Sequence, residues 1–357
     1  MKLERWSLQC YRLPYLREVV WANAREDAGV FALLKLEAEG CTGIAEGTLK
    51  DTWSGASPKS LAAALEDFLI PRLRAADLAD ELAVARAFAG IPENRLAKGM
   101  IESACWTLRA AVAKKPLWQL WGAGRSREVA WTVTRQAPKA MAVEAVDMCA
   151  QYGFRTLKVK GGQGVEVDLR ALAEIQSAVG GGVELYVDAN SAYAREDALE
   201  YVQGLASAGV TVAEDPCALQ PDRHFEELQR ASPIPILVDR SCASKEDAAL
   251  YLERGAKALS TKPGRVGLAE TRAIAALAAA RGAKTAVGIY AESALGTLVN
   301  LQQPGTMAAE QTFFLAMKEQ VSRVLPEIRG GRIELPAEAD LAQLVDWGRL
   351  AQLAYNS

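Results

Sequence analysis

Three acidic residues, Asp188, Glu214 and Asp239, each follow a short apolar segment, and the two intervals between them are nearly equal. Such spacing is typical of successive strand–helix units, whose neighbouring parallel strands lie about 4.8 Å apart. Three carboxylates at one level on adjacent strands would repel one another unless a cation lies between them. All-oxygen ligation suits Mg²⁺ or Mn²⁺ better than zinc. We therefore predict a divalent metal site, although any one of these acids alone could equally be a helix N-cap or a solvated loop residue.

Three lysines accompany these acids. Lys158 and Lys160 alternate within an apolar segment, and Lys262 ends another such segment. A lysine beside a dication and a second ammonium group has a reason to lose its proton near neutral pH, and it can then act as a general base. Removal of a proton next to a carboxylate creates an enolate, whose charge a metal ion would stabilise. The combination predicts proton abstraction from carbon next to a carboxylate, with a lysine available on each side of the substrate.

The segments that carry these residues alternate between strand and helix patterns over residues 126–320. Strands are expected at 129–134, 156–160, 184–188, 211–214, 236–239, 258–262 and 285–289, with a weakly marked eighth near 307–311. This pattern predicts an α/β fold, a (β/α)7-8 barrel of TIM type, in which functional residues occupy the C-terminal ends of the strands. An open, doubly wound sheet is the alternative, but no GxGxxG motif follows a strand candidate.

Two further parts flank the barrel. Residues 1–125 contain strand patterns followed by helical patterns, which predicts an α+β domain. The tail, residues 321–357, is expected to pack back on this domain. Together they would form a cap over the mouth of the barrel, where the predicted site lies.

The composition disfavours several classes of protein. Charged residues make up 24% of the chain and the net charge is -3, which argues against a nucleic-acid-binding protein. The N-terminus lacks the apolar run of a signal peptide, and the most apolar stretch is too short to span a membrane. A cytoplasmic protein without membrane contact is therefore expected. Because His224 is the single histidine, a Ser-His-Asp triad or a poly-histidine zinc site is disfavoured.

Six short motifs occur in order at the expected strand ends: TLKVKGG, YVDAN, VAEDP, ILVDR, STKPGRVG and GIYAESALGT. Together with GCTGIAEGT and AKGMIESACWTLRAAVAKKPLWQLWGAG in the N-terminal part, they resemble the enolase superfamily, muconate cycloisomerase subgroup, over nearly the whole chain. The resemblance implies that Asp188, Glu214 and Asp239 bind the metal. It also implies that Lys160 and Lys262 form the acid/base pair.

The same resemblance assigns supporting residues. Lys158 would assist Lys160, Glu292 would lie at the site beside the metal-bound carboxylate, and the cap loops at 20–24 and 50–57 would close over the substrate. Four residues are candidates for contact with the substrate: Trp21, Trp53, Asn190 and Arg240. For the two tryptophans, simple packing or exposure is an equally good alternative.

The sequence departs from the family pattern in four places. Arg240 replaces the glutamate that usually follows the third metal ligand, Gly267-Leu268 replaces a pair of glycines, and Thr107 stands where aspartate is usual. The eighth strand lacks an acidic pair of the kind that dipeptide epimerases carry, which argues against that activity. We expect the guanidinium at position 240 to pair with a nearby acid or with a second carboxylate on the substrate, unless it turns outward to solvent. The candidate acids are Glu214, Asp215 and Glu292.

The first hypothesis for function is a cycloisomerase of muconate-lactonizing type, because ESALGT followed by AAEQTFFLAMKEQV is more similar to that branch than to others. The second is an N-acylamino acid racemase, an o-succinylbenzoate synthase-like enzyme or a dehydratase, since the superfamily shares the proton abstraction and differs in the later steps of the reaction. A non-catalytic metal-binding or ligand-binding relative is the third. A small carboxylate substrate, Mg²⁺ or Mn²⁺, and a homo-oligomer are expected.

Overall fold

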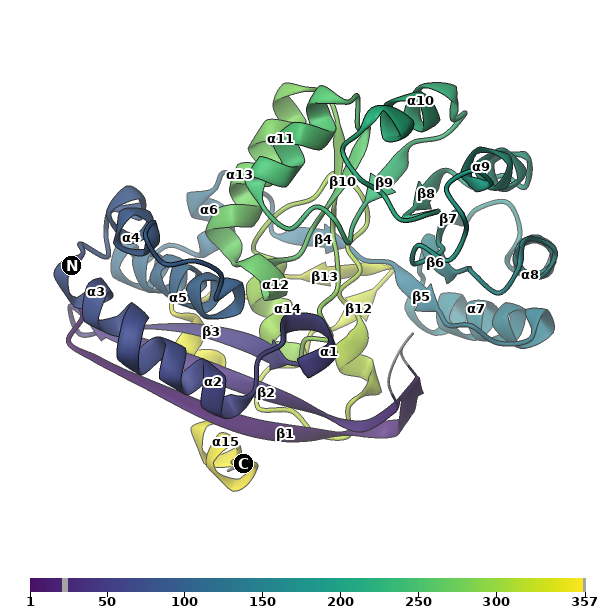
Figure 1. Ribbon diagram of the computed structural model, residues 1–357. Helices are drawn as coiled ribbons and strands as arrows, with labels where there is room; N and C mark the ends of the chain where they lie inside the picture. The colour runs from purple at the N-terminus through teal and green to yellow at the C-terminus, as the bar shows by residue number, and fades with distance from the viewer. Residues whose placement is uncertain (21–24, 356–357) are drawn as a thin grey trace.

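The computed structural model describes residues 1–20 and 25–355 (Figure 1). The N-terminal part begins with an antiparallel sheet in the order β1-β2-β3. Its strands are β1 (Arg5–Val20), β2 (Arg25–Ala38) and β3 (Cys41–Leu49). In β2, Leu34 and Leu36 are buried against the cap helices, whereas Phe31 and Leu33 are buried on the opposite face. Because side chains alternate along a strand, both faces of this sheet are covered.

Helices cover the first of these faces (Figure 1). The helices on this face are α2 (Pro58–Ala63), α3 (Ile70–Ala75), α4 (Glu81–Phe88) and α5 (Arg95–Ala113). The other two cap helices are α1 (Asp51–Ser54), at the cavity, and α6 (Leu117–Leu120), whose Leu117 is buried with Phe31 and Leu33 of the opposite face. The longest, α5, places Met100, Ala104 and Leu108 on one stripe against the sheet. A π-helical segment, Ala64–Leu69, joins α2 to α3. Pro71 follows that segment at the start of α3, and it offers no N–H to continue a regular helix.

The middle of the chain forms seven parallel strands in the order β5-β6-β7-β8-β9-β10-β11, with helices outside them (Figure 1). The strands are β5 (Trp131–Val133), β6 (Thr156–Lys160), β7 (Glu184–Asp188), β8 (Val212–Glu214), β9 (Ile236–Val238), β10 (Ala258–Thr261) and β11 (Lys284–Val287). The helices are α7 (Pro138–Tyr152), α8 (Val165–Val179), α9 (Ala198–Ser207), α10 (Arg223–Ala231), α11 (Lys245–Glu253), α12 (Pro263–Val266), α13 (Leu268–Ala280) and α14 (Ala294–Asn300). No helix in the described ranges is long and apolar enough to cross a lipid bilayer.

An irregular eighth segment closes the barrel between β11 and β5. On one side, the backbone N–H of Glu310 donates to the carbonyl of Val287 at 2.8 Å. On the other side, Ala130 donates to the carbonyl of Ala309 at 2.9 Å. The weakly marked strand near 307–311 therefore has hydrogen-bonded neighbours on both sides. The expected barrel of TIM type is confirmed.

The tail of the chain contacts both parts of the molecule. Its elements are β12 (Ile328–Arg329), β13 (Arg332–Glu334) and α15 (Trp347–Gln352). The end of the tail pairs with the free edge of β1, where the backbone N–H of Tyr355 donates to the carbonyl of Cys10. The β12–β13 hairpin pairs instead with β4 (Ser126–Glu128), and Gly331 donates to the carbonyl of Tyr152 at the N-terminal end of the barrel. The tail therefore completes the cap only in part, because its hairpin is held by the barrel.

Two departures from the family pattern contact α5 or lie in it. A Cβ on Gly267, whose φ is +89°, would lie 2.6 Å from the Cα of Gly99 in α5, so the two backbones touch only because both residues are glycines. The next position needs no glycine, because Leu268 is fully buried in the core. Thr107 accepts a hydrogen bond from the N–H of Ile44 and ties α5 to β3. Gly99 and Gly267 therefore bring the cap close to the barrel, whereas Thr107 joins two elements within the cap.

Candidate active site

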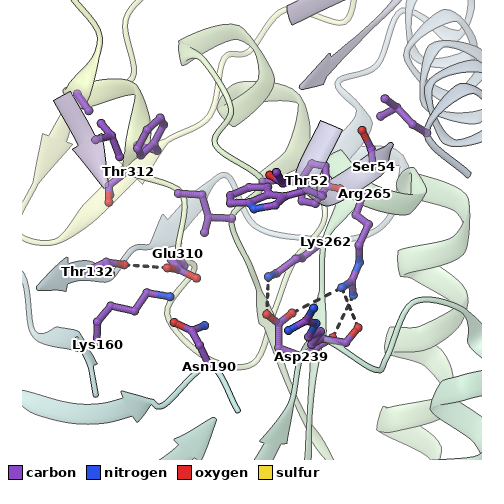
Figure 2. Close-up of a pocket in the computed structure, with 18 of the residues that line it drawn as sticks. Thr52, Ser54, Thr132, Lys160, Asn190, Asp239, Lys262, Arg265, Glu310 and Thr312 are labelled. Carbon is purple, nitrogen blue, oxygen red and sulfur yellow. Dashed lines mark hydrogen bonds and ion pairs between the residues drawn. The ribbon is translucent and has the colours of Figure 1, made fainter. Parts of the chain in front are cut away.

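A cavity of about 1660 Å³ lies where the cap meets the C-terminal ends of the barrel strands (Figure 2). On the barrel side it is lined by Lys158, Lys160, Asn190, Asp239, Lys262 and Glu310, among others. On the cap side, α1 contributes Trp53. A large concave pocket in which several charged groups converge is the expected form of a ligand site.

Lys158 is buried in the centre of this site. Its Nζ lies 2.8 Å from Glu214 Oε1, 2.8 Å from Glu310 Oε2 and 3.1 Å from Asp188 Oδ2. Burial alone would lower the pKa of Lys158, but the charges of these three carboxylates raise that pKa well above its ordinary value. In this arrangement the ammonium of Lys158 is the counter-ion of the three acids.

Lys160 follows Lys158 by two residues, so that it also faces the mouth of the barrel. Its Nζ lies 2.7 Å from Asp188 Oδ2, and its side chain is 24% exposed to the cavity. Burial would raise the pKa of Asp188, but Lys158 and Lys160 hold that pKa below its usual range. Asn190 contributes two more hydrogen bonds to Asp188, from its backbone N–H at 2.8 Å and from Nδ2 at 3.0 Å.

Lys262 directly follows β10 and contacts the third acid. Its Nζ lies 2.5 Å from Asp239 Oδ2, while Arg265 Nη1 lies 4.0 Å from Asp239 Oδ1. Burial would raise the pKa of Asp239, but Lys262 and Arg265 lower it below its usual range. In the barrel, three strands separate Lys160 from Lys262. Figure 2 shows the two ammonium groups pointing into the cavity from different sides.

The three carboxylates come from the ends of neighbouring strands, as the sequence predicts. Asp188 and Glu214 are register partners on β7 and β8, and Asp239 directly follows β9. Their side chains are turned toward the lysines, and within residues 1–20 and 25–355 no group of three His, Cys, Asp or Glu side chains is arranged to hold a metal ion.

The donor set nevertheless fits a hard divalent cation. All three ligand candidates are buried oxygen donors, and Asp239 Oδ1 has no hydrogen-bond partner in the described part of the chain. Burial and the charge of Asp188 raise the pKa of Glu214 well above its ordinary value. A positive charge bound between these carboxylates would relieve that repulsion, so Asp188, Glu214 and Asp239 could hold Mg²⁺ or Mn²⁺.

Glu310 is a site residue that could not be assigned from the sequence. It lies on the irregular eighth segment, accepts hydrogen bonds from Lys158 and from Thr132 Oγ1, and is 3% exposed. Burial would raise its pKa, but the charges of Lys158, Lys160 and Lys262 lower it. An acid in the last strand candidate was the available signal. Without regular alternation in that segment, the side of the barrel wall that it faces could not be inferred.

Glu292 lies behind the cavity wall and does not line it. Its Oε1 accepts a hydrogen bond from Asn300 Nδ2 at 2.9 Å, and its Oε2 accepts one from the N–H of Tyr290 at 2.8 Å. Burial raises the pKa of Glu292 to about 7. Gly264, just after β10, packs directly against this carboxylate, and a place for Glu292 beside a metal-bound carboxylate stays a prediction.

The residues predicted to contact the substrate differ in where the structure places them. Arg240 lines the cavity, but only its backbone N–H contacts Asp215, at 2.9 Å, and its exposed guanidinium has no acidic partner in the described ranges. The expected pairing with an acid of the protein is therefore not formed. Trp53 lines the cavity with its ring centroid 5.1 Å from that of Tyr290. Trp21 lies outside the described residues.

Two family models match the chain. The model described as "Enolase C-terminal domain-like" matches residues 140–340, which is more than half of the chain. The model described as "Mandelate racemase / muconate lactonizing enzyme, N-terminal domain" matches residues 15–122. The matched ranges correspond to the barrel with part of the tail and to the cap.

Relatives and a solved structure agree with these models. An o-succinylbenzoate synthase from Geobacillus stearothermophilus is 31% identical over 293 residues, covering 79% of this chain and 76% of the relative. Muconate cycloisomerase 1-2 from Acinetobacter lwoffii is 26% identical and covers 99% and 95%. The muconate lactonizing enzyme from Pseudomonas fluorescens, solved with muconolactone, shares the fold with a TM-score of 0.90 at 24% identity, over 99% of both chains. The chain therefore belongs to the enolase superfamily of enzymes, with the N-terminal domain of the mandelate racemase and muconate lactonizing enzyme family.

Proposed function

We propose that the chain catalyses metal-dependent transfer of a proton at the carbon next to a carboxylate, as a cycloisomerase of muconate-lactonizing type. The observation that carries this proposal is the placement of Lys160 and Lys262 on different sides of one cavity, with the three buried carboxylates between them. A lysine on each side leaves room for a planar enolate in the middle.

Each residue has a defined part in the proposed reaction. A divalent cation held by Asp188, Glu214 and Asp239 would supply Lewis-acid stabilisation to the substrate carboxylate. In the lactonizing direction, one carboxylate oxygen adds to a double bond, and the enolate that results takes a proton at carbon from a lysine ammonium. In the reverse direction, the neutral lysine removes that proton. Lys160 or Lys262 carries the proton, while Lys158 keeps its own proton and holds the carboxylates in place.

Support for a cycloisomerase comes from the muconate cycloisomerase relative, which the chain matches over nearly its full length. An N-succinylamino acid racemase from Thermus thermophilus matches 94% of the chain at 27% identity and supports a racemase in the same way. The second candidate is an o-succinylbenzoate synthase-like reaction, favoured by the higher identity of that relative over a shorter stretch. Product analysis separates the two. The protein loaded with Mg²⁺ or Mn²⁺ should convert cis,cis-muconate to muconolactone, followed by NMR. Conversion of N-succinylamino acids or of the o-succinylbenzoate precursor alone would contradict the first candidate and support the second.

Arg240 provides a prediction about the substrate within this proposal. Its guanidinium lines the cavity without an acidic partner among the described residues, so it is available for a second carboxylate, and muconate carries a carboxylate at each end. A hydrogen bond to a charged group contributes about 1.5–3 kcal/mol. Arg240→Gln should therefore raise KM for cis,cis-muconate by about 10-fold or more and leave the inhibition constant of its monomethyl ester, tested as a competitive inhibitor, nearly unchanged.

The matched control is Arg95→Gln, which removes the same charge from another exposed arginine that lines the cavity from the cap side. Arg95→Gln should change the values for cis,cis-muconate and for its monomethyl ester much less than Arg240→Gln changes the value for cis,cis-muconate. Equal losses for the diacid and the ester in Arg240→Gln, with metal affinity unchanged, would contradict a role of Arg240 in substrate selection.

A further inference from the structure

We infer that Arg135 is a positioning residue that acts through Asn190 on Asp188 and Lys160. This inference rests on the proposed function, since it concerns the same site. Arg135 lies in the loop between β5 and α7, and its half-buried side chain reaches the ends of β6 and β7. None of its own hydrogen bonds goes to a carboxylate among the described residues, so it acts through other groups.

One guanidinium holds the loops that follow both strands. Arg135 Nε donates to the carbonyl of Gly161 at 2.6 Å, directly after Lys160. Its Nη2 lies 3.4 Å from the carbonyl of Ala189, directly after Asp188. The loop carrying the proposed base and the loop carrying the first metal-ligand candidate are therefore fastened to the same planar group, whose hydrogen-bond directions are fixed.

The third contact sets the orientation of an amide. Arg135 Nη2 donates to Asn190 Oδ1 at 3.2 Å. A guanidinium can only donate, so it selects the oxygen end of the amide, and the Nδ2 end is left to face Asp188. Asn190 Nδ2 then donates to Asp188 Oδ2 at 3.0 Å. Asp188 and Arg135 therefore select the same orientation of the amide from its two ends, and without Arg135 only the contact with the carboxylate would hold it.

The orientation of the Asn190 amide matters because the carboxylate oxygen that it contacts also binds Lys160, the proposed base. Asp188 Oδ2 accepts from Asn190 Nδ2 and also from Lys160 Nζ, at 2.7 Å. The backbone of Asn190 cannot move away easily, since its N–H is bound to Asp188 Oδ1 and its φ is 51°. Arg135 therefore determines how Asp188 is presented to Lys160 and to a metal. Partners that orient metal ligands typically contribute 10- to 100-fold in affinity or activity.

The test compares Arg135→Gln, Asn190→Ala and the double variant with Arg127→Gln as the matched control. Arg127 also binds backbone carbonyls, those of Gly124 and Leu301, but it lies at the N-terminal end of the barrel. We expect Arg135→Gln to lower kcat with cis,cis-muconate and the Mn²⁺ affinity by about 10- to 100-fold each, with KM little changed. The double variant should be no worse than the poorer single variant. Arg127→Gln should lower only the midpoint of urea unfolding.

A readout without metal or substrate separates this inference from the proposed function. The Asn190 side-chain amide, assigned by its loss in Asn190→Ala, should exchange with solvent slowly in the wild type and at least about 10-fold faster in Arg135→Gln. A wild type that turns over no carboxylate would contradict the proposed function while this exchange still tests Arg135. Unchanged amide exchange, additive losses in the double variant, or a rise in KM alone would overturn the inference.

Discussion

Replacing Lys160 with methionine should lower kcat by roughly 10²- to 10⁴-fold, the usual contribution of a positioned acid or base. Methionine keeps the length of the side chain but cannot carry a proton. The same change at Lys262 distinguishes the two candidate reactions. A lactonizing reaction uses one face of the enolate, so one variant should suffer the full loss and the other a smaller one. A racemase uses both faces, so both variants should suffer it. Steady-state kinetics with metal-loaded protein measures the losses.

The control is Lys257→Met. Lys257 is exposed and directly precedes β10, whereas Lys262 directly follows that strand at its other end. It should leave kcat within about twofold of the wild type, because a surface substitution away from the site has little effect. Turnover that survives at the wild-type rate in both the Lys160 and the Lys262 variants would show that neither lysine moves the proton.

Replacing Lys158 with methionine should destabilise the metal-free protein by about 3–5 kcal/mol, the typical consequence of removing one partner from a buried ionic cluster. Three buried carboxylates, those of Asp188, Glu214 and Glu310, would lose the ammonium that lies within 3.1 Å of each. Urea unfolding in the presence of a chelator measures the loss. Addition of Mn²⁺ should recover a large part of it, because a dication can replace the missing charge.

A second variant tests whether Lys158→Met is destabilised by lost packing of the lysine methylene groups instead of by lost charge. Lys158→Met combined with Glu310→Gln has one negative charge fewer in the same space, so it should be more stable than Lys158→Met alone. A double variant that is less stable than the single variant would contradict the inference that Lys158 stabilises the protein by neutralising these carboxylates. Unfolding of Lys158→Met at the wild-type urea midpoint would contradict it as well.

The acids and lysines at the strand ends could be located from the sequence because the barrel repeats its strand–helix unit. Asp188 and Glu214 are register partners as the spacing predicts, and Lys160 faces the same end of the barrel. Glu310 could not be located from the sequence because its segment lacks a recognisable alternation of apolar residues. Hydrogen bonds to β11 and β5 hold this segment in the barrel. The sequence order alone did not show that the tail hairpin would pair with β4.

Side-chain direction in loops could not be predicted from the sequence. Glu292 follows a barrel strand as the metal-ligand candidates do, yet its carboxylate turns behind the wall to Asn300. Arg240 was expected to find an acid, but Asp215 binds its backbone instead. The role of Arg135 depends on three acceptors brought together by two strand ends, and no spacing in the chain indicates such a contact.

Solvent deuterium exchange at carbon tests proton transfer next to a carboxylate most directly. Muconolactone and an N-succinylamino acid are incubated in D₂O with the protein and Mg²⁺ or Mn²⁺. The signal of the exchangeable proton next to the carboxylate, which in muconolactone is one of the two CH₂ protons, is followed by ¹H NMR. We expect that signal to disappear from at least one of the two compounds with wild-type protein. It should persist after chelation of the metal and in the double variant Lys160→Met/Lys262→Met. Exchange that continues at the wild-type rate in the double variant, or no exchange in either compound with metal-bound wild-type protein, would contradict lysine-mediated proton transfer at this site.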